Sequence, residues 1–140
     1  MKAQSAMETI ILATVLLLMT VPAAFLIISV AKSSQHEIRQ GQISKIGNDI
    51  ISTSEKVYYQ GTPSKITLEE AFPEGITNIS TSSHGSFNEL LFIMELDSKH
   101  SEISFPSKVK LEGNFGSGFS RGIKKVIIEA ADGYVRISIK

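Results

Sequence analysis

The chain begins with a long hydrophobic stretch. Residues 9–31 carry no charge and are rich in Leu, Ile, Val and Ala. As an α-helix with a rise of ~1.5 Å per residue, this stretch would span about 35 Å, enough to cross the hydrocarbon core of a bilayer. It is longer than the apolar core of a typical secretory signal peptide and lacks a clear small-residue cleavage site at its far end. The pattern therefore predicts a helix that is retained on the chain and lies in an apolar environment.

The following residues, 32–60, continue the helix with an amphipathic pattern. Apolar residues recur at spacings of three, four and seven, and Thr53 occupies the position that would complete their stripe. The stripe consists of Ile43, Ile46, Ile50 and Val57. Gly41 and Gly47 lower the helix propensity, which predicts a bend or a close contact there. Pro63 cannot continue the helix, so we expect it to end near residue 60.

After Pro63 the hydrophobic pattern has a period of two, as in β-strands. The seven segments that we expect to form strands are 65–72, 76–80, 89–96, 101–105, 108–113, 124–130 and 134–140. Residues 90–94 (LLFIM) are continuously apolar, which predicts a central strand covered on both faces. Asp132-Gly133 predicts a hairpin between the last two strands. The sequence thus predicts an α+β fold, a long hydrophobic-then-amphipathic helix packed on a small antiparallel β-sheet or sandwich.

Charge and cysteine content narrow the classes of function. The chain has fourteen Lys and Arg and fourteen Asp and Glu residues. A nucleic-acid-binding surface needs clustered basic residues, and the sequence shows no such cluster. The absence of cysteine excludes disulfides, thiol catalysis and thiolate metal sites. An extracytoplasmic domain of this chain would therefore depend on its hydrophobic core for stability.

Residues that could carry catalysis or bind a metal ion are scattered along the chain. His36, His84 and His100 fall in a predicted helix, turn and loop. Asp97, His100 and Glu102 could ligate a metal, but they are equally typical of polar turns. The sequence contains no Gly-x-Ser-x-Gly nucleophile elbow. We therefore expect no catalytic residues, no metal site and no cofactor.

The glycine-rich segment 113–122 (GNFGSGFSRG) shares only its glycine content with phosphate-binding loops. It lacks their Lys-Ser/Thr ending, and it connects two predicted strands where such a loop joins a strand to a helix. We expect a flexible hairpin connection. Phe115 and Phe119 either cover an edge of the core or form an exposed contact patch.

Two residues are unusual for a plain membrane anchor. Glu8 stands directly before the uncharged run. It is either solvated at the headgroup level, as an acid in the first helical turn, or carried into an apolar environment where it needs a positive partner. Pro22 lies inside the run, where it removes a backbone hydrogen bond and predicts a kink or loosened turn near residues 18–22. Neighbouring helices can satisfy the freed carbonyl, so Pro22 favours assembly with other helices. Lys2, on the short side of the run, favours a cytoplasmic N-terminus.

Residues 3–8 (AQSAME), followed at once by the hydrophobic run, resemble the class III signal peptide of archaeal type IV pilins and pilin-like proteins. The family pattern is Gln-x-Ser-x-Glu. Gln4 and Glu8 match this pattern, whereas Ala6 stands where serine is usual and Ala3 where glycine commonly precedes the cleavage site. Residues 56–76 also resemble the junction between helix and head in such proteins.

The resemblance implies cleavage between Ala3 and Gln4 by a prepilin peptidase, after which the hydrophobic helix stays on the mature protein. Glu8 would then be the fifth residue, where type IV pilins carry their glutamate. The implied partner of Glu8 is the freed N-terminal amine of a neighbouring subunit, an amine that Gln4 can lose by cyclising. The segments implied are a leader at 1–3, a transmembrane and assembly helix at 4–31, an amphipathic helix at 32–60 and a pilin-like β-rich extracellular head at 64–140.

The function implied is that of a structural subunit, major or minor, of an archaeal type IV pilus-like filament. Its expected partners are other filament subunits, a class III prepilin peptidase, a pilus assembly platform and, before assembly, the membrane. The precursor would be a single-pass membrane protein and the assembled subunit would lie at the cell surface, where such filaments serve adhesion. The alternative is a membrane-anchored extracytoplasmic binding or accessory protein that does not polymerise. An enzyme is the third possibility.

Asn78-Ile79-Ser80 matches the acceptor pattern for N-glycosylation. Such a short pattern also occurs by chance. The neighbouring turn at Pro73-Glu74-Gly75 favours surface exposure of Asn78. We therefore take Asn78 as a possible glycosylation site.

Overall fold

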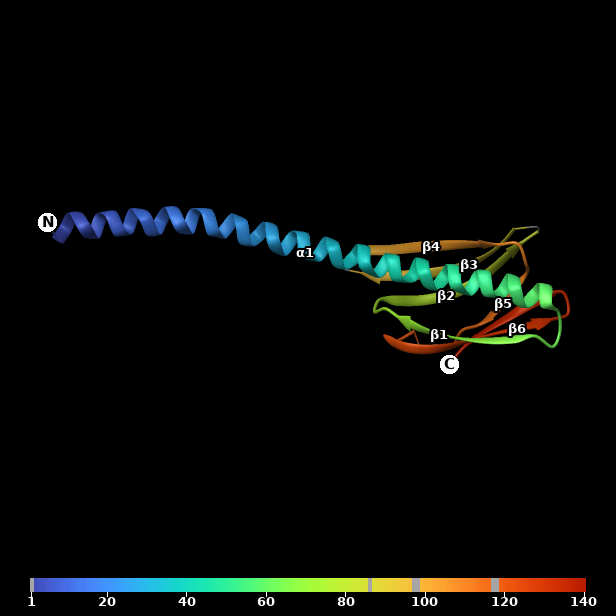
Figure 1. The fold of residues 1–140 in the computed structure, drawn as a ribbon. Coiled ribbons are helices and arrows are strands. Elements are labelled where there is room, and N and C mark those ends of the chain that lie inside the picture. Colours follow the sequence, from blue (N-terminus) through green and yellow to red (C-terminus); the bar gives the residue numbers. More distant parts are fainter. Residues whose placement is uncertain (1, 86, 97–98, 117–118) are drawn as a thin grey trace. The chain divides into compact units, whose positions relative to one another are not determined.

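The computed structural model describes residues 2–85, 87–96, 99–116 and 119–140. Helix α1 (Lys2–Gln60) is followed by seven strands (Figure 1). They are β1 (Lys65–Phe72), β2 (Ile76–His84), β3 (Phe87–Leu96), β4 (Lys99–Ser107), β5 (Leu111–Asn114), β6 (Gly122–Ala131) and β7 (Tyr134–Ile139). The chain separates into two compact units, Met1–Glu37 and Ile38–Lys140. This is the α+β layout that the sequence predicts.

The first unit is the N-terminal part of α1. Its stretch Ala6–Ala31 is long and apolar enough to cross a membrane, and none of it is buried within the chain. The helix continues without interruption through Pro22. Because proline has no N–H group, the carbonyl of Leu18 loses its usual donor one turn later. Next to it, the Thr20 hydroxyl donates to the Leu17 carbonyl at 3.4 Å.

In the second unit the strands form two sheets. One has the order β1-β6-β7-β5 and the other β2-β3-β4. The predicted hairpin at Asp132-Gly133 is confirmed, since Ala131 pairs with Tyr134 across it. Two predictions are wrong. Strand β5 pairs in parallel with β7, so the sheet is mixed. Strands β5 and β6, which segment 113–122 joins, are separated by β7 in the sheet, so this connection is a crossover and not a hairpin.

The core of this unit lies between the sheets and the C-terminal part of α1. The predicted helix stripe is confirmed, because Ile43, Ile46, Ile50 and Val57 are all buried. The polar residue that completes it is Ser54 and not Thr53. The Ser54 hydroxyl is fully buried and donates to the Ile50 carbonyl at 2.7 Å, so it enters the core without losing its hydrogen bond. The sheets contribute Phe72, Leu90, Phe92, Met94, Phe105, Val126, Ile128, Val135 and Ile137, among others.

Strand β3 is the centre of its sheet, as residues 90–94 predict, but only one of its faces is covered. Leu90, Phe92 and Met94 are buried, whereas Leu91 and Ile93 on the opposite face are half-buried. The continuous apolar run therefore conceals a period of two. Two adjacent hydrophobic side chains remain on the outer face of this sheet.

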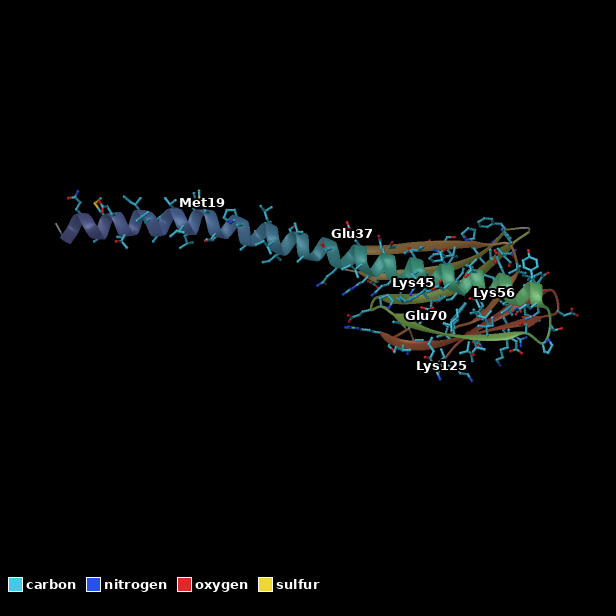
Figure 2. All side chains as sticks on the ribbon, viewed as in Figure 1. Met19, Glu37, Lys45, Lys56, Glu70 and Lys125 are labelled. Carbon is cyan, nitrogen blue, oxygen red and sulfur yellow. The ribbon has the colours of Figure 1, made fainter. Side chains whose placement is uncertain are left out.

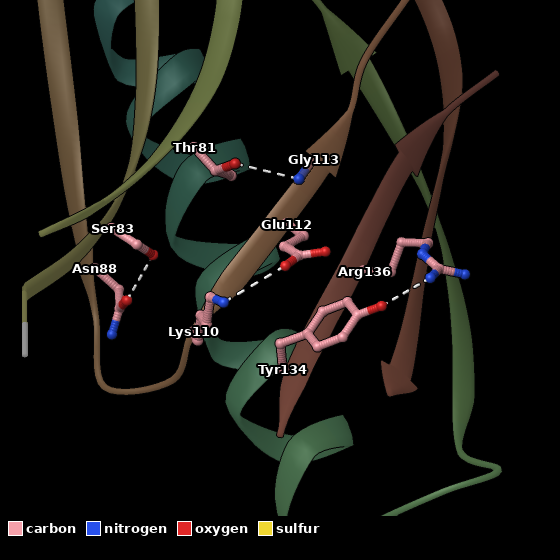
Figure 3. A network of polar contacts seen from close by, with 8 residues as sticks. All are labelled: Thr81, Ser83, Asn88, Lys110, Glu112, Gly113, Tyr134 and Arg136. Atoms are coloured by element: carbon pink, nitrogen blue, oxygen red, sulfur yellow. Dashed lines mark hydrogen bonds and ion pairs between the residues drawn. The ribbon is translucent and has the colours of Figure 1, made fainter. Parts of the chain in front are cut away.

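The two sheets meet where β2 runs beside β5 (Figure 3). The Gly113 backbone N–H donates to the Thr81 hydroxyl at 3.1 Å, and Ser83 donates to Asn88 at 2.8 Å. A Cβ atom on Gly113 would lie 1.9 Å from the ring of Phe115, so the ring packs directly on the glycine backbone. This close approach explains why glycine occupies position 113.

The helix contacts the other sheet edge through Gly47. A Cβ atom built there would lie 2.4 Å from the ring of Phe105 in β4. The predicted close contact at Gly47 is thus confirmed. About two turns further along α1, Glu55 accepts a hydrogen bond from the Lys108 backbone N–H at 3.3 Å. These contacts seat the C-terminal part of α1 against strand β4.

The two helix glycines are expected to respond in opposite directions to alanine. Nothing lies within 4 Å of a Cβ on Gly41, so Gly41→Ala should raise the free energy of unfolding by about 0.5–1 kcal/mol through helix propensity. Gly47→Ala should lower it by about 1–3 kcal/mol, because the methyl group displaces the Phe105 ring. Urea unfolding of the full chain in detergent, followed by tyrosine fluorescence, measures both. Stabilisation by Gly47→Ala would show that the Phe105 contact is unimportant.

Candidate functional site

The residues predicted for processing and assembly lie together at the start of α1. Ala3, Gln4 and Glu8 all belong to the helix, and the side chains of Gln4 and Glu8 are exposed. Gln4 and Glu8 are four residues apart, so they lie on the same face of the helix. The helix begins at Lys2 and has no acid in its first turn, so Glu8 lies in the second turn of the uncut chain.

The apolar part of this helix presents its side chains to the outside on all sides. More than a dozen large hydrophobic residues between Met7 and Val30 are exposed in this chain. The largest exposed fractions, above 70%, belong to Leu18, Met19 and Phe25. An α-helix of a soluble domain normally hides one face against a core. Among the described residues, no side chain buries the apolar window of this helix, and an apolar surface of this kind is suited to contact with lipid or another protein.

Asn78 lies on the exposed side of β2, the edge strand of its sheet. The pairing of β2 with β3 changes register between Ile76 and Asn78, so Asn78 lies beside an irregularity in the strand. Ile79, the middle residue of the glycosylation pattern, is buried. The Asn78 side chain, which would carry a glycan, is thus accessible to solvent, whereas the next residue, Ile79, packs in the core.

The scattered polar candidates do not form a reaction centre in the described structure. Within residues 2–85, 87–96, 99–116 and 119–140, no group of three His, Asp or Glu side chains could hold a metal ion. Asp97 lies outside the described residues, as does the side chain of His36. His84 and Ser82 lie 2.9 Å apart, Nδ1 to Oγ, near the exposed end of strand β2. His100 and Glu102 lie on β4 opposite Glu95 and Ile93.

The glycine-rich crossover places both its phenylalanines at the core. Phe115 is buried, and Phe119 is half-buried and packs against the core cluster. Phe119 also lines a pocket of about 410 Å³ between this crossover and the turn before β2. The other lining residues are Glu74, Gly75, Ile76, Thr77, Ser120 and Arg121. The two phenylalanines thus cover an edge of the core.

A cluster of charged residues at the margin of the core was missed by the sequence reasoning. Glu70 of β1 lies near Asp49 and Lys45 of α1 and is half-buried. Burial raises the pKa of the Glu70 carboxyl, the Asp49 carboxylate raises it further, and Lys45 opposes both effects. Lys124, opposite Glu70 in the register, donates instead to the Ser120 hydroxyl at 3.1 Å. The alternation along β1 contains the signal for this acid, because Glu70 follows Ile66 and Leu68 at intervals of two and therefore shares their inward face.

Replacement of Glu70 with glutamine is expected to stabilise the fold at neutral pH by only about a few tenths of a kcal/mol, because solvent screens the charges around this partly exposed carboxyl. The folded state holds the Glu70 proton more tightly than the unfolded state does, because the folded pKa lies above the ordinary value of 4.5. The free energy of unfolding therefore falls as the pH rises from about 4.5 through the folded pKa, and Glu70→Gln removes this loss.

Urea unfolding at pH 4.5 and pH 7.5 measures the difference. The control is Glu69→Gln, since Glu69 lies on the outer face and contacts Lys125 at 3.6 Å. Equal effects of the two variants would contradict the assignment to Glu70.

In comparisons with known proteins, no family model matches the sequence, and neither a curated protein nor a solved structure matches it significantly.

Proposed function

We propose that the chain is a subunit of an archaeal type IV pilus-like filament, with a pilin-like fold. Its maturation is cleavage between Ala3 and Gln4 by a class III prepilin peptidase. The observation that carries the proposal is the apolar stretch Ala6–Ala31, exposed on all sides, with Gln4 and Glu8 placed one turn apart at its start. A lipid bilayer can cover this surface before assembly, and neighbouring subunits can cover it in a filament.

The glutamate favours polymerisation over simple anchoring. A helix that only anchors a protein does not need an acid at the start of its apolar segment, because an ionisable side chain in an apolar environment is energetically costly. In a bundle of identical helices, the carboxylate can pair with a positive group of the neighbouring subunit. Lys2 before the run favours a cytoplasmic N-terminus for the precursor and a head outside the cell.

The second candidate is a membrane-anchored extracytoplasmic accessory protein that does not polymerise. It is favoured by the same apolar stretch, which is sufficient to cross a bilayer by itself. In this case the helix remains in lipid and the head acts as a monomer. Partners would then bind to the head and not to the helix.

The mass of the N-terminal peptide from native membranes and from sheared surface material separates the two candidates. We expect a mature chain that begins at Gln4, or at its cyclised form about 17 Da lighter from loss of ammonia, and its recovery in filaments seen by electron microscopy. An intact Met1 in material that contains no polymer would overturn the proposal and support the anchored monomer.

A further inference from the structure

The outer faces of the two sheets differ in how their charges are compensated. On the β1-β6-β7-β5 sheet, Lys65 contacts Glu129 at 3.7 Å and Lys125 contacts Glu69 at 3.6 Å. In the strand register, Glu129 of β6 lies opposite Arg136 of β7, and Arg136 lies opposite Glu112 of β5. This face alternates positive and negative side chains, as is typical of a surface exposed to water.

The outer face of the β2-β3-β4 sheet has a different character. Its middle is formed by the half-buried side chains of Leu91 and Ile93. Carboxylates surround them at Glu89 and Glu95 of β3 and Glu102 of β4. Across this face, no Lys or Arg side chain that the structure describes stands among these acids. We call Glu89, Leu91, Ile93, Glu95 and Glu102 the acidic face.

A complementary surface runs along α1 in the second unit. The exposed residues of the helix recur every three or four positions, and the charged residues among them are Lys45 and Lys56 (Figure 2). The half-buried acids Asp49 and Glu55 flank them. Neither lysine has a carboxylate within ion-pair distance among the described side chains, although Lys45 lies near Asp49 and Glu70. We call Lys45, Asn48, Ser52 and Lys56 the basic stripe.

The charges on the two surfaces have similar spacing. Lys45 and Lys56 are eleven residues apart, about 16 Å along a helix at ~1.5 Å per residue. Glu89 and Glu95 are six residues apart, about 20 Å along a strand at ~3.3 Å per residue. Glu102 lies opposite Ile93, about 13 Å along the strands from Glu89 by the same rise.

The direction of the two surfaces also agrees. Glu55, the neighbour of Lys56, accepts a hydrogen bond from the Lys108 backbone N–H. Ser107, which precedes Lys108, pairs with Asn88 of β3, and Asn88 is the neighbour of Glu89. Lys56 and Glu89 therefore lie at the same end of the unit, and Lys45 and Glu95 lie toward the other. Two copies placed side by side in the same orientation would bring lysines opposite glutamates at both ends.

We propose that the acidic face of one copy of this chain docks on the basic stripe of the next copy. The contact joins two different surfaces, so it repeats from copy to copy and does not close into a dimer. Leu91 and Ile93 would lie against the helix near Ser52, and the charge pairs would fix the register. This inference rests on the proposed filament, because exposed charge pairs are weak and need subunits already held together by their helices.

The position of Asn78 is compatible with this contact. It lies on β2, next to Ile93 on the side away from β4. A glycan on Asn78 would cover the β2 margin of the acidic face. Docking would then use the β3 and β4 side, which carries the carboxylates.

Because the chain contains no cysteine, paired cysteines can test the contact directly. The full-length chain with Ser52→Cys and Ile93→Cys would be co-expressed with a class III prepilin peptidase and an assembly platform, then mildly oxidised. We expect a ladder of three or more linked copies on a non-reducing gel, removed by reductant. Each single variant should give dimers at most. The matched control, Ser52→Cys with Thr67→Cys, uses an exposed residue on the other sheet and should give at least fivefold less ladder.

Charge reversal tests the register of the contact. Lys45→Glu with Lys56→Glu should reduce the ladder at least fivefold at low salt, and the further changes Glu89→Lys and Glu102→Lys should restore it. The inference would be overturned if the test pair and the control pair of cysteines gave equal ladders. It would also be overturned if the only product were a dimer linked through position 93 of both copies. Filaments without a ladder would overturn it and leave the proposed function standing. A ladder without filaments would overturn the proposed function and leave the contact standing, and absence of both would overturn both.

Discussion

Glu8→Ala is expected to reduce the yield of surface filaments at least tenfold while N-terminal processing continues. In a bundle of apolar helices the carboxylate lies away from water and is tolerated only beside a positive group. Removal of one member of such a buried pair costs about 3–5 kcal/mol. We expect a loss of binding free energy of this size at every subunit contact to impair filament assembly. The proposed cleavage site, Ala3-Gln4, is unchanged in this variant, so the mature N-terminus should keep its mass.

The yield is measured by shearing and electron microscopy, and processing by mass spectrometry of the membrane fraction. The matched control is Glu37→Ala, which removes an exposed acid of the same helix outside the apolar run (Figure 2). Its filament yield should equal that of the unchanged chain. A normal yield from Glu8→Ala would mean that the acid has no part in assembly.

Phe92→Ala is expected to lower the free energy of unfolding of the head by about 3–5 kcal/mol. Phe92 is fully buried in the central strand β3, and its ring centroid lies 5.7 Å from that of Phe105 and 6.4 Å from that of Phe72. The substitution removes the buried ring and both aromatic contacts, and leaves a cavity between the sheets. Since small domains have only 5–15 kcal/mol in total, this loss is a large fraction of their stability.

Urea unfolding of the full chain in detergent, followed by tyrosine fluorescence, measures the loss because all three tyrosines lie in the second unit, Ile38–Lys140. Leu91→Ala is the matched control. Its side chain is adjacent in sequence but lies on the outer face and is half-buried. We expect it to cost less than half as much as Phe92→Ala. Equal losses from the two variants would contradict the one-sided burial of β3.

The local pattern of the sequence was sufficient for most elements of the fold. Every segment predicted as a strand overlaps an observed strand, and α1 ends at Gln60, next to the glycine and proline that cannot continue it. The reason is that period and turn residues act over a few neighbouring positions. The helix stripe was predicted for the same reason, except that Ser54 and not Thr53 faces the core.

The pairing of the strands depended on contacts that the local pattern does not record. Nothing in residues 111–114 indicates a parallel partner, and β5 pairs with β7 because the crossover carries the chain past that strand. The apolar run of β3 likewise concealed its exposed side, since Leu91 and Ile93 look like core residues in the sequence. Only the register with β2 and β4 assigns them to the outer face.

The candidate site divides in the same way. Gln4, Glu8 and the uncharged run are adjacent in the chain, so the sequence by itself determined the membrane-type helix and the place of its acid, and it predicts the processing motif. The tertiary structure decided which charges meet: Glu70 with Asp49 and Lys45, and an acidic sheet face separate from a basic helix stripe. Those residues lie far apart in sequence, and only the folding of strands around the helix brings their side chains onto common surfaces.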